Sequence, residues 1–154
     1  MPTLRQSLIS HLTRLYPFYN RNLRDCDVVE VPVRPLSAII SEESIKSIRL
    51  IKIDVEGFEA EILQGGQEVL RSNTPDAILF ELNEKLEYPI RDQPVIKILR
   101  DFRYRFFCIP RCVFQMHLEP FDPDSYNALI GHDFLAVREG ETYENIAKLV
   151  RASV

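Results

Sequence analysis

RLIKIDVEGFEAEILQGG, residues 49–66, joins a strand pattern directly to a helix pattern. The part around it from 48 to 55 is rich in branched apolar residues, which predicts a strand buried on both faces of a sheet. Apolar residues then recur at helical spacing from Phe58 to Leu63, until two glycines at 65–66 interrupt or cap the helix. A strand that runs straight into a helix is the building unit of an α/β fold.

The alternation of strand and helix patterns continues on both sides of this stretch. Strands are predicted at 27–33, 77–82, 104–109, 113–118 and 132–138, helices at 3–16, 93–102 and 142–152, and a short polar helix or turn at 41–47. Pro32 favours an edge position for the first of these strands. Because strand and helix alternate, we expect an α/β fold with a mostly parallel sheet and flanking helices.

The composition is that of a globular domain, and it excludes several classes of protein. The chain has 154 residues, of which 45% are hydrophobic and 27% charged. Its net charge of −4 gives no reason to expect nucleic acid as a partner. No apolar run approaches the roughly 20 residues of a membrane span, and no signal-peptide core is present. We therefore expect a cytoplasmic protein without a transmembrane segment.

The N-terminal segment differs from the rest of the chain in charge. Residues 1–24 contain four arginines and no acid, and residues 3–16 place leucines and an isoleucine on one helical face. A transit peptide or a membrane-surface helix would have this pattern too, but a helix that packs on the domain is favoured. The predicted organisation is an amphipathic helix and linker at 1–26, followed by one domain at 27–154.

Three cysteines, Cys26, Cys108 and Cys112, lack the spacing of a disulfide framework. Cys108 and Cys112 with His117 are three residues of the types that bind zinc, but a zinc site needs a fourth ligand and a repeated short spacing. Reduced structural cysteines are the favoured interpretation, and no metal site is predicted.

Carboxylates gather where two predicted strands end. Asp54 ends the strand at 48–55, and Glu81 ends the strand at 77–82. If these strands are parallel neighbours, their ends lie about 4.8 Å apart. Ligands of open α/β sheets bind outside the carboxyl ends of the strands, so the sequence predicts a shared acidic cleft.

Structural roles for the same acids stay open. Asp54 and Glu56 are suited to capping a helix that starts near Gly57, and Glu59 in its first turn is favoured by the helix dipole. The residue types leave capping and function equally open for Asp54, and they favour capping for Glu56 and Glu59. Glu81 is as compatible with a solvated strand end as with a functional role.

Several spaced elements of the chain resemble one enzyme family. Lys52–Gly57, Glu59, Leu63–Gly65 and Ile78–Glu81 together resemble the C-terminal half of the FkbM-type S-adenosylmethionine-dependent methyltransferases. The resemblance extends in order over about 28–138 and is strongest over 48–84. It implies a Rossmann-like methyltransferase fold that transfers a methyl group from S-adenosylmethionine, usually to a hydroxyl oxygen of a small molecule or sugar.

The resemblance also implies roles for three carboxylates as catalytic residues. Asp54 would lie beside the methionine end of the cofactor and beside the acceptor, where it would orient the acceptor hydroxyl or take its proton. Glu56 and Glu81 would line the acceptor side. Positioning of donor and acceptor is expected to supply most of the acceleration.

One part of the family pattern is missing from the chain. Such folds hold their cofactor with a glycine-rich loop after the first strand, whereas the first glycine here is Gly57. The chain therefore looks like the second half of the enzyme, and we expect weak binding of S-adenosylmethionine or none. The alternative is a non-catalytic binding or structural module descended from a methyltransferase. In either case the strand at 50–55 lacks its usual neighbour. Its edge is therefore expected to be uncovered unless the strand at 27–33, the N-terminal helix or another chain covers it, and a homo-oligomer or a complementing chain is the expected partner.

Overall fold

The computed structural model describes residues 32–82, 89–110, 117–125 and 132–152. The chain divides into two compact units, Met1–Val33 and Arg34–Val154. The helix predicted at 3–16 lies outside the described residues, as does the strand predicted at 27–33 except for Pro32 and Val33, which have no regular structure. The domain boundary expected after residue 26 therefore stays a prediction.

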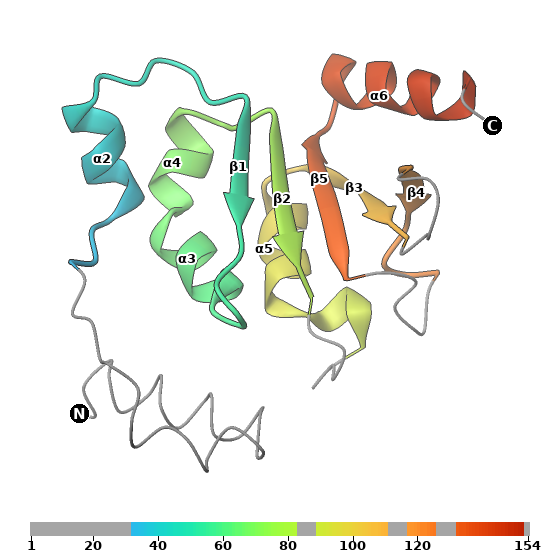
Figure 1. Cartoon of the computed structure of the whole chain (residues 1–154), viewed down its shortest axis with the longest axis horizontal. Helices are drawn as coiled ribbons and strands as arrows, with labels where there is room; N and C mark the ends of the chain where they lie inside the picture. The colour runs from blue at the N-terminus through green and yellow to red at the C-terminus, as the bar shows by residue number, and fades with distance from the viewer. Residues whose placement is uncertain (1–31, 83–88, 111–116, 126–131, 153–154) are drawn as a thin grey trace, which may run out of the picture. The chain divides into compact units, whose positions relative to one another are not determined.

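The second unit contains the helices and strands that are labelled in Figure 1, together with one short 3-10 helix that has no label there. In chain order they are α2 (Leu36–Glu42), β1 (Leu50–Ile53), α3 (Glu59–Gly65), α4 (Gln67–Ser72), β2 (Ala77–Glu81), the 3-10 helix η2 (Ile90–Asp92), α5 (Pro94–Asp101), β3 (Tyr104–Ile109), β4 (Glu119–Phe121), β5 (Asp133–Arg138) and α6 (Glu141–Ala152).

Most of the predicted elements are confirmed. β2, β3, β5, α5 and α6 agree with the predicted ranges to within one residue at each end. The polar segment at 41–47 ends α2 and forms a turn. The strand predicted at 113–118 falls mostly outside the described residues, and β4 begins just after it at Glu119. The helix after β1 is interrupted at Gly66, where a Cβ atom would lie 3.1 Å from the Ile62 carbonyl oxygen.

The five strands form one mixed sheet in the order β1-β2-β5-β3-β4. Only β1 and β2 pair in parallel, while the pairs β2–β5, β5–β3 and β3–β4 are antiparallel. The prediction of a mostly parallel sheet is therefore wrong. Parallel neighbours need a crossover connection, usually a helix, and the sequence has no helical pattern between β3 and β5. β5 instead enters between β2 and β3 and runs opposite to both.

β1 is less buried than its composition suggested. Ile53 is buried, but Leu50 is 55% exposed and Lys52 is exposed, so the expectation of burial on both faces is wrong. The cause is the position of β1 at the edge of the sheet. On the face that carries Leu50 and Lys52, the described helix is α6, and it packs against β5.

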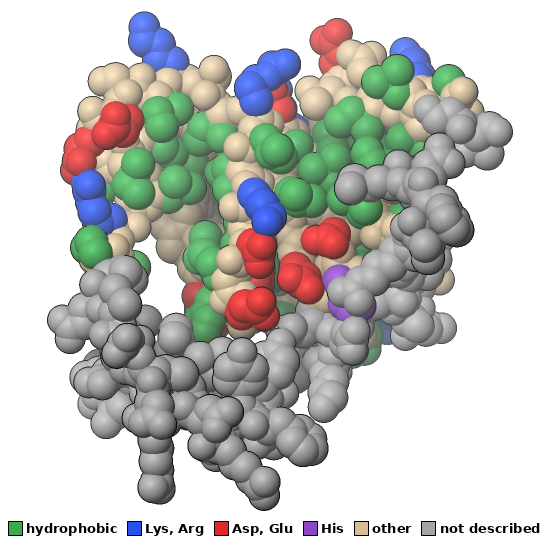
Figure 2. Space-filling model, viewed as in Figure 1, with side chains coloured by type: hydrophobic (Ala, Val, Ile, Leu, Met, Phe, Trp, Pro, Cys, Tyr) green, Lys and Arg blue, Asp and Glu red, His purple; other side chains and the backbone are tan. Residues whose placement is uncertain are grey.

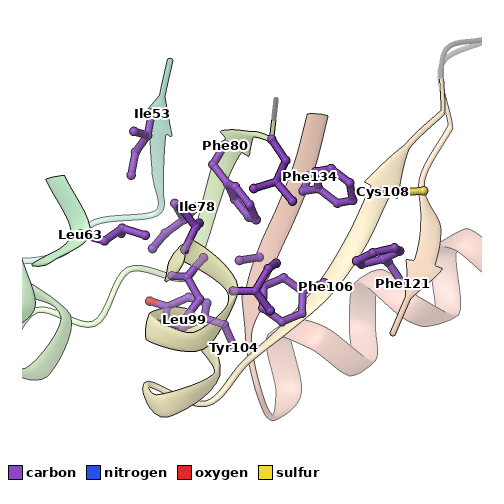
Figure 3. Close-up of a cluster of buried hydrophobic side chains, with 14 of the residues drawn as sticks. Ile53, Leu63, Ile78, Phe80, Leu99, Tyr104, Phe106, Cys108, Phe121 and Phe134 are labelled. Atoms are coloured by element: carbon purple, nitrogen blue, oxygen red, sulfur yellow. The ribbon is translucent and has the colours of Figure 1, made fainter. Parts of the chain in front are cut away.

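The larger core lies on the opposite face, between the sheet and the helices α3 and α5 (Figure 3). The Phe134 ring packs against Phe80 at a centroid distance of 5.8 Å and against Phe121 at 5.0 Å. Tyr104 donates a 2.6 Å hydrogen bond to the Pro75 carbonyl oxygen, and burial raises the pKa of its hydroxyl to about 12. These contacts pack β2, β3, β4 and β5 closely together, which limits their movement relative to one another.

Within the described residues, no helix is long and apolar enough to cross a membrane.

Candidate functional site at the carboxylate edge

β1 and β2 end at the same level of the sheet. Their parallel register places Ile53 beside Phe80, so Asp54 and Glu81 follow at neighbouring positions. β5 begins there with Asp133, which lies opposite Glu81. Figure 2 shows acidic side chains gathered where β1 and β2 end and β5 begins in Figure 1. We call Asp54, Glu56, Glu81 and Asp133 the carboxylate edge.

Glu81 and Asp133 form a close cross-strand pair of like charges. The Leu82 N–H donates to the His132 carbonyl oxygen at 2.9 Å, so the adjacent pair Glu81–Asp133 is a non-hydrogen-bonded pair. The Cα atoms in such pairs are about 4.5 Å apart, and their side chains lie on one face. Burial raises the pKa of the Glu81 carboxyl, and the charges of Asp133, Glu56 and Asp54 raise it further, while His132 lowers it.

Asp54 is held by a lysine of its own strand. Lys52 Nζ lies 2.7 Å from Asp54 Oδ2, and the two side chains are 61% and 48% exposed. Residues two apart in a strand share a face, which places this pair on the open face of β1. The hydrogen bond and the charge of Asp54 raise the pKa of Lys52. Asp54 is therefore oriented along the sheet surface.

Glu56 has an unusual backbone conformation. Its φ of 54° is in the left-handed region, and Gly57 follows with a φ of 99°. The other described non-glycine residues with positive φ, Ser44 and Arg103, come shortly after helices, where this conformation is a common helix end. Glu56 instead lies ahead of a helix. A positive φ at a non-glycine residue costs free energy, so the surrounding turn must hold Glu56 in this conformation.

Glu59 has a structural role. It is the first residue of α3, and its side chain is almost fully buried. Its Oε1 atom accepts hydrogen bonds from the main-chain N–H groups of Val55 at 3.3 Å and Gly57 at 3.2 Å. The carboxylate therefore holds the turn between β1 and α3, in addition to its place in the first turn of the helix.

The capping interpretation of Asp54 and Glu56 is wrong. The N-cap residue of α3 is Phe58, and no side chain makes a capping hydrogen bond there. Asp54 bonds to Lys52 instead. The turn places the N–H donors at 55 and 57 around Glu59, so the acid that satisfies them comes from inside the helix and not from before it.

Sequence reasoning missed Asp133 and Lys52. Asp133 is separated from Glu81 by 52 positions along the chain (133 minus 81), and the antiparallel pairing that joins them was not foreseen. The alternation in the stretch from Lys52 to Asp54 was a usable signal, because residues two apart in a strand share a face.

The thiol of Cys108 is free and fully buried in the core, and burial raises its pKa to about 11. These features fit a reduced structural cysteine, as expected. Cys26 and Cys112 lie outside the described residues. In the part of the chain that is described, no three or more His, Cys, Asp or Glu side chains are placed so that together they could hold a metal ion, and this includes the carboxylate edge.

The methionine end of S-adenosylmethionine carries a positive sulfonium, a positive ammonium group and a negative carboxylate, and the carboxylate edge would suit the two positive groups only. Carboxylates beside an exposed sheet end attract such charges. The adenosine end is a poorer fit. Ahead of β1, the described residues contain no glycine-rich turn that follows a strand, so no backbone cradle for that half of the cofactor is present among them.

Comparison with known proteins gives one family. The family model described as "Methyltransferase FkbM domain" matches residues 9–106, which is more than half of the chain and includes β1, β2 and the turn between β1 and α3. No curated protein and no solved structure matches the chain.

Proposed function

Because the chain belongs to the FkbM methyltransferase family, we propose that it uses S-adenosylmethionine to methylate a hydroxyl oxygen of a small molecule or sugar. The observation that carries the proposal is the carboxylate edge, where Asp54, Glu56 and Glu81 meet beyond the ends of two parallel strands. This is the place where open α/β sheets bind their ligands.

Glu81 is the proposed proton acceptor for the hydroxyl group. A hydroxyl oxygen is a better nucleophile as its proton leaves, and a carboxylate is a better base when its pKa is closer to neutral. The pKa of Glu81 is raised by burial and by the neighbouring acids, whereas Asp54 is held in an ion pair with Lys52. Asp54 is thus better suited to orient the acceptor and to attract the positive end of the cofactor.

Glu56 is proposed to line the acceptor side. Its positive φ directs the chain sharply from β1 into α3 and keeps the carboxylate exposed beside Glu81. S-adenosylmethionine would supply the activated methyl group. The residues of this chain would bind its charged end, orient the acceptor and hold a proton, and since the adenosine end lacks a cradle among the described residues, we expect weak binding.

The arrangement of strands supports a partial Rossmann-like methyltransferase fold. β1, β2 and β3 run in one direction, since β5 is antiparallel to both β2 and β3. The helices α3, α4 and α5 lie in the connections between these three strands. Strand–helix–strand connections of this kind are typical of nucleotide-binding α/β folds.

Binding of S-adenosylmethionine and S-adenosylhomocysteine to the full chain tests the cofactor assignment. In a nuclear magnetic resonance titration, we expect millimolar binding, with shifts centred on the amides of residues 54–57 and 81. Calorimetry then gives the affinity. A micromolar dissociation constant would contradict the weak-binding expectation, and an unchanged spectrum at millimolar ligand would contradict the cofactor site.

Methyl transfer tests the role of Glu81. With isotopically labelled donor and a panel of sugar and small-molecule hydroxyl acceptors, Glu81→Gln should lower the transfer rate by about a hundredfold, the lower range for loss of a general base. Glu43→Gln removes one exposed charge at the C-cap of α2 and is the control. Equal rates for Glu81→Gln and the unchanged chain would exclude Glu81 as the proton acceptor.

A non-catalytic binding or structural module is the second candidate, favoured by one observation. The first glycine in the given sequence is Gly57, so residues 1–56 contain no glycine-rich loop ahead of β1. The module would keep the carboxylate edge without binding the cofactor. The titration above separates the two candidates.

A further inference from the structure

The outer edge of β1 is open within the described part of the chain. The sheet order places β1 at one end, where β2 is its one described neighbour. The opposite edge strand, β4, contains Pro120, which cannot donate a hydrogen bond to a further strand. β1 has no proline and ends at Ile53, after which Asp54 leads into the bend at Val55. Of the two edges, β1 is the one suited to pairing.

The main-chain groups of β1 alternate between β2 and the open edge. The Ala77 N–H donates to the Arg49 carbonyl oxygen at 3.1 Å, so the main chain of Arg49 faces β2. By alternation along the strand, Ile51 and Ile53 face β2 as well. The N–H and C=O groups of Leu50 and Lys52 therefore point outward, and Asp54 joins them when pairing extends by one residue.

We propose that β1 pairs antiparallel with β1 of a second copy of this chain, about a two-fold axis at Ile53. In this register Lys52 of each copy lies opposite the partner's Asp54, and Ile53 lies opposite the partner's Ile53. Ile51 lies opposite the partner's Val55. In each Lys52–Asp54 pair, the main-chain N–H and C=O groups of both residues point toward the other copy. Each pair can therefore exchange two hydrogen bonds, which gives four across the interface.

The charge pattern selects this register over its neighbours. Registers shifted by one residue would place outward main-chain groups opposite inward ones. A shift by two residues in one direction places Lys52 opposite the partner's Lys52, and a shift in the other direction places Asp54 opposite the partner's Asp54. Like charges directly opposite are unfavourable, whereas opposite charges stabilise a cross-strand pair.

The side chains are already arranged for such a pairing. Lys52 and Asp54 lie on one face of β1, where their charged atoms are 2.7 Å apart. Ile53 and the partly buried Ile51 and Val55 lie with the core on the other face. Across the two-fold axis, the charges would alternate on one face and the apolar side chains would continue the core on the other.

Exposed lysines on edge strands also keep copies of a protein apart. Lys52 therefore either joins two copies through Asp54 or prevents them from pairing. Sedimentation of charge-reversed variants of the full chain over a range of protein concentrations distinguishes these two roles. We expect the unchanged chain to form a reversible dimer. Lys52→Glu should raise its dissociation constant about tenfold or more, because two attractive pairs become repulsive. Asp54→Lys should also raise the dissociation constant, because two lysines then lie opposite each other at both positions.

An equimolar mixture of the two variants is the decisive sample. A mixed pair places the introduced glutamate opposite the introduced lysine at one position and the unchanged Asp54 opposite the unchanged Lys52 at the other. Both pairs are attractive, so association should return to the level of the unchanged chain, while each variant alone stays dissociated. Lys148→Glu, on α6 and away from β1, makes the same change in net charge and should leave association unchanged. Melting curves confirm that each variant is folded.

Three results would overturn the proposal. One is a monomer at all concentrations, which would assign Lys52 to keeping copies apart or the edge to another occupant. A second is a dimer that Lys52→Glu does not weaken. The third is a mixture of variants that associates no better than each variant alone.

Discussion

The turn between β1 and α3 and the meeting of β2 with β5 each place a glutamate at the same end of the sheet, in different surroundings. Glu59 in the turn accepts hydrogen bonds from two main-chain N–H groups. Glu81 at the end of β2 lies opposite Asp133 and near Glu56 and Asp54, and its pKa is raised. The main-chain donors make the Glu59 carboxylate stabilising for the fold, whereas the neighbouring like charges make the Glu81 carboxylate destabilising when it is ionised. The partners of an acid, more than its position after a strand, decide whether its charge stabilises the fold.

Removal of the Glu59 side chain should have the largest effect on stability. Glu59→Ala would leave two partly buried N–H groups without their acceptor, which should lower the free energy of unfolding by about 1–3 kcal/mol. Chemical denaturation measures this change. Glu59→Gln keeps an oxygen acceptor and should recover most of the loss.

Glu61 supplies the control, since it is an exposed glutamate on the same helix. Glu61→Ala should change the free energy of unfolding by no more than about 0.5 kcal/mol. Equal losses for the alanine variants at 59 and 61 would show that the hydrogen bonds of Glu59 do not hold the turn.

Replacement of Glu81 should have a smaller effect of the opposite sign. Glu81→Gln removes one of two like charges that lie directly opposite, and should raise the free energy of unfolding at neutral pH by about 0.5 kcal/mol. The pKa of Glu81 in the folded chain is raised above its ordinary value of 4.5. Its protonated form therefore stabilises the fold at low pH, and this stability is lost as the pH rises through the folded pKa.

The gain from Glu81→Gln should accordingly shrink as the pH falls and vanish below 4.5, where the unchanged chain is protonated in both states. Denaturation at a series of pH values, with Glu43→Gln as the control for loss of one exposed charge, measures the difference. A gain that grows toward low pH would contradict the crowding of carboxylates.

Replacement of Asp54 should have the smallest effect on stability. Because its partner Lys52 is exposed and α3 has no side-chain cap, Asp54→Asn and Asp54→Ala should leave the unfolding midpoint unchanged to within about 2 °C. Thermal melts at neutral pH measure both. If Ala alone were destabilising by about 1 kcal/mol, the usual worth of an N-cap, a capping role would have to be restored.

The elements that sequence reasoning predicted well are those with long apolar patterns. α5 presents Val95, Ile96 and Leu99 to the core at helical spacing, and β3 coincides with its predicted range. β1 was predicted as a strand but not as an exposed one, because its branched residues resemble those of a buried strand. Burial depends on which helix covers the face, and that is a property of the assembled sheet.

The candidate site was likewise predicted in part, where local patterns sufficed, and missed where it depends on the assembled sheet. Asp54 and Glu81 were found because parallel strands bring their carboxyl ends to one edge of a sheet, and β1 and β2 are parallel neighbours as required. The place of Asp133 was missed, since an antiparallel strand between β2 and β3 follows from no local pattern. Pairing between distant segments is decided by the fit of whole surfaces.

By itself, the sequence determined the α/β class, the positions of most helices and strands, the family and the placing of two acids at strand ends. Local spacing and turn residues suffice for these features, because they depend on neighbours within a few positions. The tertiary structure decided the mixed order of the sheet, the buried role of Glu59 and the crowding of Glu81 by Asp133. These depend on side chains and strands that are distant in sequence and meet only when the core has closed, so no local pattern carries them.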